Sequence, residues 1–261
     1  MTKASPGNDA EHGGKEGTLI SHLVELRSRL LRMAVAILAL FVIMAPFSGK
    51  IFALVARPLV ERLPGGATMI ATEVASPFLT PFKLTLVLAV IVAMPWVLYQ
   101  AWAFVAPGLY SQERRFGIPL VVSSVFLFYS GIAFAYFVVF PLIFGFFASI
   151  DIGGVTMMTD IARYLDFVMA LFLAFGLAFE VPIVTILLVW AGFTTPAKLA
   201  RKRAYVFLGA FVIGMLLTPP DVISQSLLAV PMYALFELGI FMSRVLVPGH
   251  REVEVQQGEQ S

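Results

Sequence analysis

Six apolar stretches divide this chain, and they restrict its possible folds more than any other feature of the sequence. A helix must offer about 20 mainly apolar residues to cross the roughly 30 Å hydrocarbon core of a bilayer. Only helices and closed barrels can satisfy their own backbone groups there. The chain is therefore predicted to be an all-α integral membrane protein with six transmembrane helices. The predicted spans cover about residues 30–47, 78–99 (apolar to 105), 118–146, 164–190, 205–217 and 222–242.

The composition excludes an ordinary soluble domain. Hydrophobic residues make up 59% of the 261 residues and charged residues only 13%, whereas soluble domains carry about 25% charged residues. The chain has no cysteine, so it can form neither a disulfide nor a thiolate metal site. The net charge of +2 is too small to indicate binding to nucleic acid.

The distribution of basic residues predicts the orientation of the spans. Cytoplasmic loops of membrane proteins carry an excess of lysine and arginine. Of the 18 basic residues, 13 fall on the side of the two termini, which places both termini in the cytoplasm. Residues 1–17 are predicted to be a disordered leader, residues 18–245 the six-helix membrane domain, and residues 246–261 a disordered cytoplasmic tail.

Prolines mark two places where the chain is expected to turn. The fifth span has only about 13 residues, and Pro219 and Pro220, followed by Asp221, separate it from the sixth. Because proline cannot continue a helix, this pair predicts a tight turn between two short helices. The outer segment 48–75 contains Pro58 and is predicted to hold a short interfacial helix followed by an extended stretch.

Two glutamates lie on the predicted cytoplasmic face. Glu25 belongs to an amphipathic segment and precedes Arg29 by four residues, a spacing that also suits a simple surface ion pair. Glu113 lies beside two arginines in the loop between the second and third spans, so a solvated charge is the alternative there. If the fold brings the two carboxylates together, they form a site for a cationic partner. A guanidinium would suit such a site because it can donate bidentate hydrogen bonds.

Glu180 lies in the middle of the fourth span, two residues before Pro182. An ionisable group at this depth costs about 2.5–3.5 kcal/mol on insertion scales. Such a residue is either a neutral, hydrogen-bonded acid that serves helix packing, or part of a polar patch facing a cavity, groove or partner helix. Glu237 in the sixth span supports the same argument more weakly, because it lies nearer the inner face.

No catalytic or cofactor-binding motif occurs in the sequence. The three histidines lie outside the spans, and the motifs of zinc proteases, serine hydrolases and nucleotide-binding loops are missing. The chain is therefore not expected to be an enzyme or to hold a metal or cofactor. A secondary transporter for a small solute remains an alternative, although the sequence shows no internal repeat. An intramembrane hydrolase would lack a nucleophile–base pair.

Seven segments recur here in the order in which they occur in one known family. They are HLVELRSRL from His22, ATEVASPFLTPFKLT from Ala71, YQAWAFVAPGLYSQERR from Tyr99, FAYFVVFPLIFGF from Phe134, FGLAFEVPI from Phe175, LLTPPDVISQ from Leu216 and PMYALFELGIF from Pro231. With these segments, which together extend over about residues 18–245, the chain resembles the TatC family. TatC is the polytopic core of the twin-arginine protein translocase.

The resemblance implies a fold and a function. TatC proteins are concave, glove-like bundles of six helices in the bacterial inner membrane. They bind the twin-arginine signal peptides of folded export substrates. With single-span TatA and TatB partners, and with further copies of TatC, they form a translocation site that is powered by the proton-motive force.

The resemblance also assigns roles to individual residues. Glu25 and Glu113 resemble the acceptors for the arginine pair of the signal peptide, and Glu180 matches an intramembrane polar position on the concave face. The other matches are Arg27, Phe104 and Pro107 on the signal-peptide surface, Met215, Thr218 and Gln225 in the region that contacts TatA and TatB, and the outer-loop positions Pro58, Pro219, Pro220 and Asp221.

Overall fold

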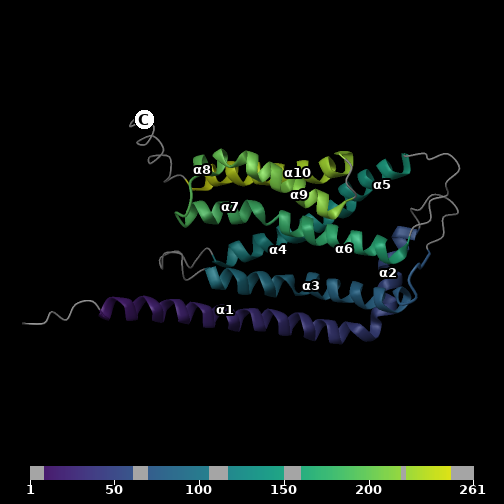
Figure 1. The fold of residues 1–261 in the computed structure, drawn as a ribbon, viewed down its shortest axis with the longest axis horizontal. Helices are drawn as coiled ribbons and strands as arrows, with labels where there is room; N and C mark the ends of the chain where they lie inside the picture. The colour runs from purple at the N-terminus through teal and green to yellow at the C-terminus, as the bar shows by residue number, and fades with distance from the viewer. Residues whose placement is uncertain (1–8, 61–69, 106–116, 150–159, 219–221, 248–261) are drawn as a thin grey trace, which may run out of the picture.

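The protein is a bundle of long helices that run side by side (Figure 1). The computed structural model describes residues 9–60, 70–105, 117–149, 160–218 and 222–247. The elements in chain order are α1 (Asp9–Met44), a 3-10 turn η1 (Ala45–Phe47), α2 (Ser48–Val60), α3 (Ser76–Val105), α4 (Gly117–Phe134), a π-helical turn η4 (Ala135–Val139), α5 (Phe140–Ser149), α6 (Ile161–Ala178), α7 (Val181–Trp190), α8 (Pro196–Arg201), α9 (Arg203–Leu217) and α10 (Val222–Leu246).

Five segments among the described residues are long and apolar enough to cross a membrane. They are 23–55, 76–104, 118–143, 161–190 and 222–246, and they confirm the apolar stretches from which membrane spans were expected. The remaining predicted span corresponds to α9, which has 15 residues. At 1.5 Å per residue this helix is about 22 Å long, shorter than the hydrocarbon core of a typical bilayer.

The first and last helices, α1 and α10, lie at opposite sides of the bundle (Figure 1). Helix α1 forms one side and packs mainly on α3, whereas α10 forms the other side and packs on α7 and α9. Between these sides, α4 packs on α3 and on α6. No residue in the most apolar stretch of α1 is buried. Helix α1 is therefore a peripheral helix that presents most of its surface to the lipid.

Helix α1 begins earlier than the sequence predicts. A disordered leader was expected over residues 1–17, but α1 already includes Asp9. The short helix that was expected after the first span corresponds to α2. The extended stretch expected after that helix falls mostly on residues 61–69, outside the described residues.

A hydrogen-bonded cap ties the segment before α3 to the start of α6. Asp160 is the N-cap of α6, and its Oδ1 accepts hydrogen bonds from the backbone N–H groups of Ala162 and Arg163. Its Oδ2 accepts hydrogen bonds from the hydroxyl and the backbone N–H of Thr72. These bonds, that of the Thr72 hydroxyl above all, hold the pKa of Asp160 well below its ordinary value.

Two glycines allow α4 and α6 to approach closely at the centre of the bundle. A Cβ atom on Gly131 of α4 would lie 2.5 Å from the backbone oxygen of Phe175 in α6. A Cβ on Gly176 of α6 would lie 2.6 Å from the ring of Phe128 in α4. Both phenylalanines are fully buried. The central packing therefore depends on the missing side chains at these two positions.

Substitution of Gly131 by alanine should destabilise the bundle, because the new methyl group would collide with the backbone of α6, which cannot rotate away. We expect a loss of about 1–3 kcal/mol in the free energy of unfolding. Thermal unfolding of the reconstituted protein would measure it. Gly209→Ala in α9 is the matched control, since no heavy atom lies within 4 Å of its added Cβ. Equal stability of the two variants would contradict this packing.

Candidate functional site

Glu180 lies where α6 ends and α7 begins. Helix α6 stops at Ala178 and α7 starts at Val181, with Pro182 in its first turn. Proline has no N–H, so Pro182 cannot donate the helical hydrogen bond to the carbonyl of Ala178. The chain therefore breaks its regular helix at this point and turns through Phe179 and Glu180. Helix α10 packs closely against this break. Gly239 of α10 has no side chain, and an added Cβ there would lie 3.0 Å from Pro182 Cα.

The carboxyl group of Glu180 is buried in the bundle. The residue is 7% exposed. Ser124 of α4, which is fully buried, is the hydrogen-bonding side chain beside the carboxyl. Neither carboxyl oxygen makes a hydrogen bond of standard geometry with any residue that the structure describes. The Ser124 oxygen in turn accepts a hydrogen bond from Trp102 Nε1 of α3, at 2.8 Å.

This arrangement leaves hydrogen-bonding capacity at the centre of an apolar bundle. Because the Ser124 oxygen accepts from Trp102, its own hydroxyl hydrogen remains available to Glu180. Buried polar groups in proteins are normally hydrogen-bonded, and the exceptions point to a function or to a missing partner. The geometry thus shows a buried carboxyl group that is not fully hydrogen-bonded, and its role as a polar patch for another helix stays a prediction.

Replacement of Ser124 by alanine should destabilise the protein, because it leaves the Trp102 indole N–H without its acceptor and removes the neighbour of Glu180. An unpaired buried polar group costs about 1–3 kcal/mol. Ser130→Ala is the control on the same helix, because the Ser130 hydroxyl bonds within its own helix, to the carbonyl of Phe126 one turn earlier. If Ser124→Ala lowers thermal stability no more than Ser130→Ala does, the hydrogen bond between Trp102 and Ser124 is not important for stability.

A second polar cluster joins α1 to α3. Arg29 donates from Nε and Nη2 to Glu25 Oε1, at 3.0 and 2.5 Å. Its Nη1 donates to Gln100 Oε1 of α3, at 3.2 Å. The Gln100 side chain is buried, whereas the side chain of Glu25 is 37% exposed. The i,i+4 pair expected from the sequence therefore exists, and Arg29 also anchors it to a helix 71 residues away in the chain.

The other residues of the predicted signal-peptide surface are only partly visible. Phe104 is half-buried in the last turn of α3, and Arg27 is exposed on α1. Glu113 and Pro107 lie outside the described residues. The predicted pairing of Glu25 with Glu113 therefore stays a prediction.

The junction of α9 and α10 is stabilised by its own polar side chains. The buried Thr218 hydroxyl donates to the carbonyl of Gly214, and Gln225 Nε2 donates to the carbonyl of Phe211 at 2.7 Å. Met215, in contrast, is 50% exposed. Of the three residues expected at a partner contact, it is the one that presents its side chain outward. Pro219, Pro220 and Asp221 lie outside the described residues, and the same holds for the side chain of Pro58 in α2.

Glu237 differs from Glu180, although the sequence suggests the same interpretation for both. Arg203 at the start of α9 donates from Nε and Nη2 to the two Glu237 oxygens, each at 2.7 Å. The Tyr233 hydroxyl donates to the same carboxylate, also at 2.7 Å. Glu237 is thus a paired group that fastens α9 to α10, and it leaves little capacity for an outside partner.

The sequence did not point to an ion pair between α3 and α6. Lys83 Nζ lies 2.6 Å from Asp166 Oδ1. The side chains are 57% and 44% exposed, so the pair faces outward from two apolar helices. In the sequence alone, Lys83 is typical of a lysine whose long side chain extends toward the membrane surface. Only the tertiary structure shows that α6 supplies a partner.

Removal of one member of this ion pair should lower the free energy of unfolding more than removal of both. Lys83→Met leaves Asp166 as an unpaired charge on an apolar helix. The expected cost lies below the roughly 2.5–3.5 kcal/mol of a charge at the bilayer centre, because the pair is off-centre. Lys83→Met with Asp166→Leu should recover most of this loss. Unfolding in lipid nanodiscs would measure both, and a double variant less stable than the single one would argue against the pairing.

Metal binding has no support in the described part of the chain, where no group of three or more histidine or acidic side chains could hold an ion. The fold and these sites define a multi-pass α-helical membrane protein with polar clusters at its centre and at the ends of its helices. The family model described as "Sec-independent protein translocase protein (TatC)" matches residues 21–231. The chain belongs to the TatC family.

Individual relatives agree with this assignment. The protein named Sec-independent protein translocase protein TatC in Azotobacter chroococcum mcd 1 is 60% identical over 234 residues, which cover 90% of this chain and 91% of that protein. The protein of the same name in Escherichia coli K12 is 58% identical over 236 residues, covering 90% and 92%. A crystal structure titled twin arginine translocase receptor TatC superposes with a TM-score of 0.79 at 38% identity, over 86% of this chain and 98% of that one.

The family assignment decides between the alternatives that the sequence left open. The chain is a core subunit of the Tat translocase, a protein-transport component and not an enzyme. Neither the solute transporter nor the intramembrane hydrolase is needed to explain the apolar helices and the buried carboxyl group.

Proposed function

We propose that this chain is the signal-peptide receptor of a twin-arginine translocase in the bacterial cytoplasmic membrane. In this role it binds twin-arginine signal peptides at its cytoplasmic face. Together with single-span TatA- and TatB-type partners, and with further copies of itself, it exports folded proteins at the expense of the proton-motive force. The observation that carries the proposal is the Glu25 carboxylate, which is fixed at the end of the bundle by Arg29, itself bonded to Gln100.

A topology of six crossings with both termini in the cytoplasm supports this role. The start of α1, the end of α3, the short α8 and the end of α10 gather at one end of the bundle (Figure 1). That end carries most of the basic residues, as cytoplasmic ends do. The topology requires the short α9 to count as a crossing, which a helix of about 22 Å achieves where the bilayer thins.

The geometry of Glu25 suits the recognition of a guanidinium group. Both hydrogen bonds from Arg29 end on Oε1, and Oε2 accepts none from the residues that the structure describes. An incoming arginine can therefore bind Oε2 without first displacing Arg29. Arg29 in turn holds the carboxylate in place, so less side-chain freedom is lost on binding. A lysine would bind less well, because it lacks the planar fork that matches a carboxylate.

Glu180 supports the interaction with a single-span partner. Both carboxyl oxygens are buried in this chain alone, so a partner helix with a polar side chain at mid-membrane depth can donate a hydrogen bond to them only where the helices around Glu180 separate. This contact would offset the cost of burying both groups. Met215 lies on the outward surface of α9 near the α9–α10 junction, and we assign it, with Thr218 and Gln225, to the contact with TatA and TatB.

Substitution of Glu25 provides the direct test. Glu25→Ala and Glu113→Ala should each leave the protein inserted in the membrane but abolish site-specific crosslinking to a signal peptide with two arginines. Glu73→Gln, an exposed acidic residue beyond the opposite end of α3, is the control and should crosslink like the parent protein.

The outcome distinguishes recognition from unfolding. Protease protection and thermal stability of the Glu25 variant should match those of the parent protein, because Arg29 keeps its bond to Gln100. Undiminished crosslinking in the double variant Glu25→Ala, Glu113→Ala would reject the role of these carboxylates.

A further inference from the structure

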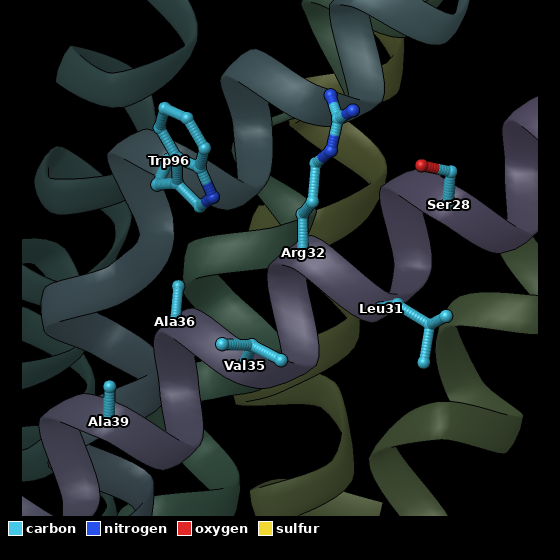
Figure 2. A pocket seen from close by; sticks show the side chains of 7 residues that line it. All are labelled: Ser28, Leu31, Arg32, Val35, Ala36, Ala39 and Trp96. Atoms are coloured by element: carbon cyan, nitrogen blue, oxygen red, sulfur yellow. The ribbon is translucent and has the colours of Figure 1, made fainter.

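A groove runs between α1 and α3 just inside the predicted cytoplasmic face. Its volume is about 490 Å³, within the range of small-molecule sites. Figure 2 shows the lining side chains, with Arg32 extending from α1 toward α3. The lining residues are Ser28, Leu31, Arg32, Val35, Ala36, Ala39 and Trp96.

Small side chains on α1 create the hollow. Ser28, Arg32 and Ala36 follow one another at intervals of four residues, and Ala39 follows three residues later, so all four lie on one helix face. The methyl and hydroxymethyl groups fill little of the space between the two helices. Because α1 packs mainly on α3 among the described residues and its most apolar stretch has no buried residue, the hollow opens toward the lipid.

The groove lies at the depth of the lipid headgroups. The pair Arg29–Gln100 marks the cytoplasmic end of the contact between α1 and α3. Arg32 and Trp96 are about one helical turn deeper on the same two helices. Trp96 packs on Tyr99 with ring centroids 5.6 Å apart, and both rings are exposed. Exposed tryptophan and tyrosine side chains are typical of the boundary between headgroups and acyl chains.

The charges of the groove favour an anion at its mouth and hydrocarbon along its floor. Arg32 is exposed, and no carboxylate of the described residues lies within ion-pair distance of its guanidinium. Below Arg32 the lining residues Val35, Ala36 and Ala39 are all apolar. A second copy of this chain in the same orientation would bring its own Arg29 and Arg32 to this depth, and the like charges would repel each other.

We propose that this groove is a binding site for one anionic phospholipid of the cytoplasmic leaflet. Its phosphate binds the Arg32 guanidinium, its glycerol region lies against Ser28 and the Trp96 indole, and one acyl chain follows Val35, Ala36 and Ala39 along α1. The bound lipid completes the open side of the contact between α1 and α3. The site does not depend on what the chain transports, only on α1 crossing the membrane.

Quenching of Trp96 fluorescence by brominated lipids tests the proposal. The protein is reconstituted into vesicles that contain either dibrominated phosphatidylglycerol or dibrominated phosphatidylcholine in an unbrominated background. The same measurement on Trp96→Phe isolates the Trp96 signal from those of Trp102 and Trp190. We expect phosphatidylglycerol to be preferred at Trp96 by about fivefold, which corresponds to roughly 1 kcal/mol for one basic side chain near an anionic headgroup.

Two variants separate the headgroup from the acyl chain. Arg32→Gln should abolish the preference while Trp96 is still quenched, and Ala39→Leu should reduce quenching by both lipids because it fills the floor. Arg27→Gln is the control, since Arg27 is exposed on α1 but does not line the groove.

Two results would overturn the proposal. Equal quenching by both lipids in the parent protein would exclude selection of an anionic headgroup. Weak quenching by both lipids would show that another protein helix covers the groove. A single cysteine at Ala39 would then identify a second copy through disulfide formation, since the chain has no other cysteine.

Discussion

The close contact between α4 and α6 determines the centre of this molecule. It exists because two positions, Gly131 and Gly176, have no side chain, so that each helix can press against a buried phenylalanine of the other. In lipid there is little hydrophobic gain from bringing helices together, so close packing and interhelical hydrogen bonds must supply the attraction. The same contact places Ser124 beside the break at Glu180.

The bundle changes in character from its centre to its edges. Around Glu180 the helices are tightly packed, and the break before Pro182 is fixed by α4, α3 and α10 together. At the α1 edge, packing is looser, and a three-residue polar cluster with a shallow groove holds two helices side by side. At the other edge, the ion pair of Arg203 with Glu237 fastens α9 to α10. The tightly packed centre is thus joined to α1 on one side and to α9 and α10 on the other by separate polar contacts.

Much of the fold could be predicted from the sequence, because a span is a local property. Apolar runs located the five long spans, and the burial of Glu180 followed from its place within such a run. Pairings between helices could not be predicted in the same way. Nothing in the neighbourhood of Arg29 points to Gln100, 71 residues away, and nothing around Lys83 points to Asp166. The different surroundings of Glu180 and Glu237 also depend on neighbours that only the fold supplies.

The π-helical turn η4 has a consequence for the phase of the third span. Ser124 and Ile143 are both fully buried and are 19 residues apart. In a regular α-helix, 19 residues make about five turns plus a further 100°, so the two side chains would point in different directions. The wide turn, in which the Phe140 N–H bonds to the Ala135 carbonyl, absorbs one residue. The remaining 18 steps make about five complete turns. The span thus behaves as a regular helix with one residue inserted, and this insertion keeps its two halves facing the same core.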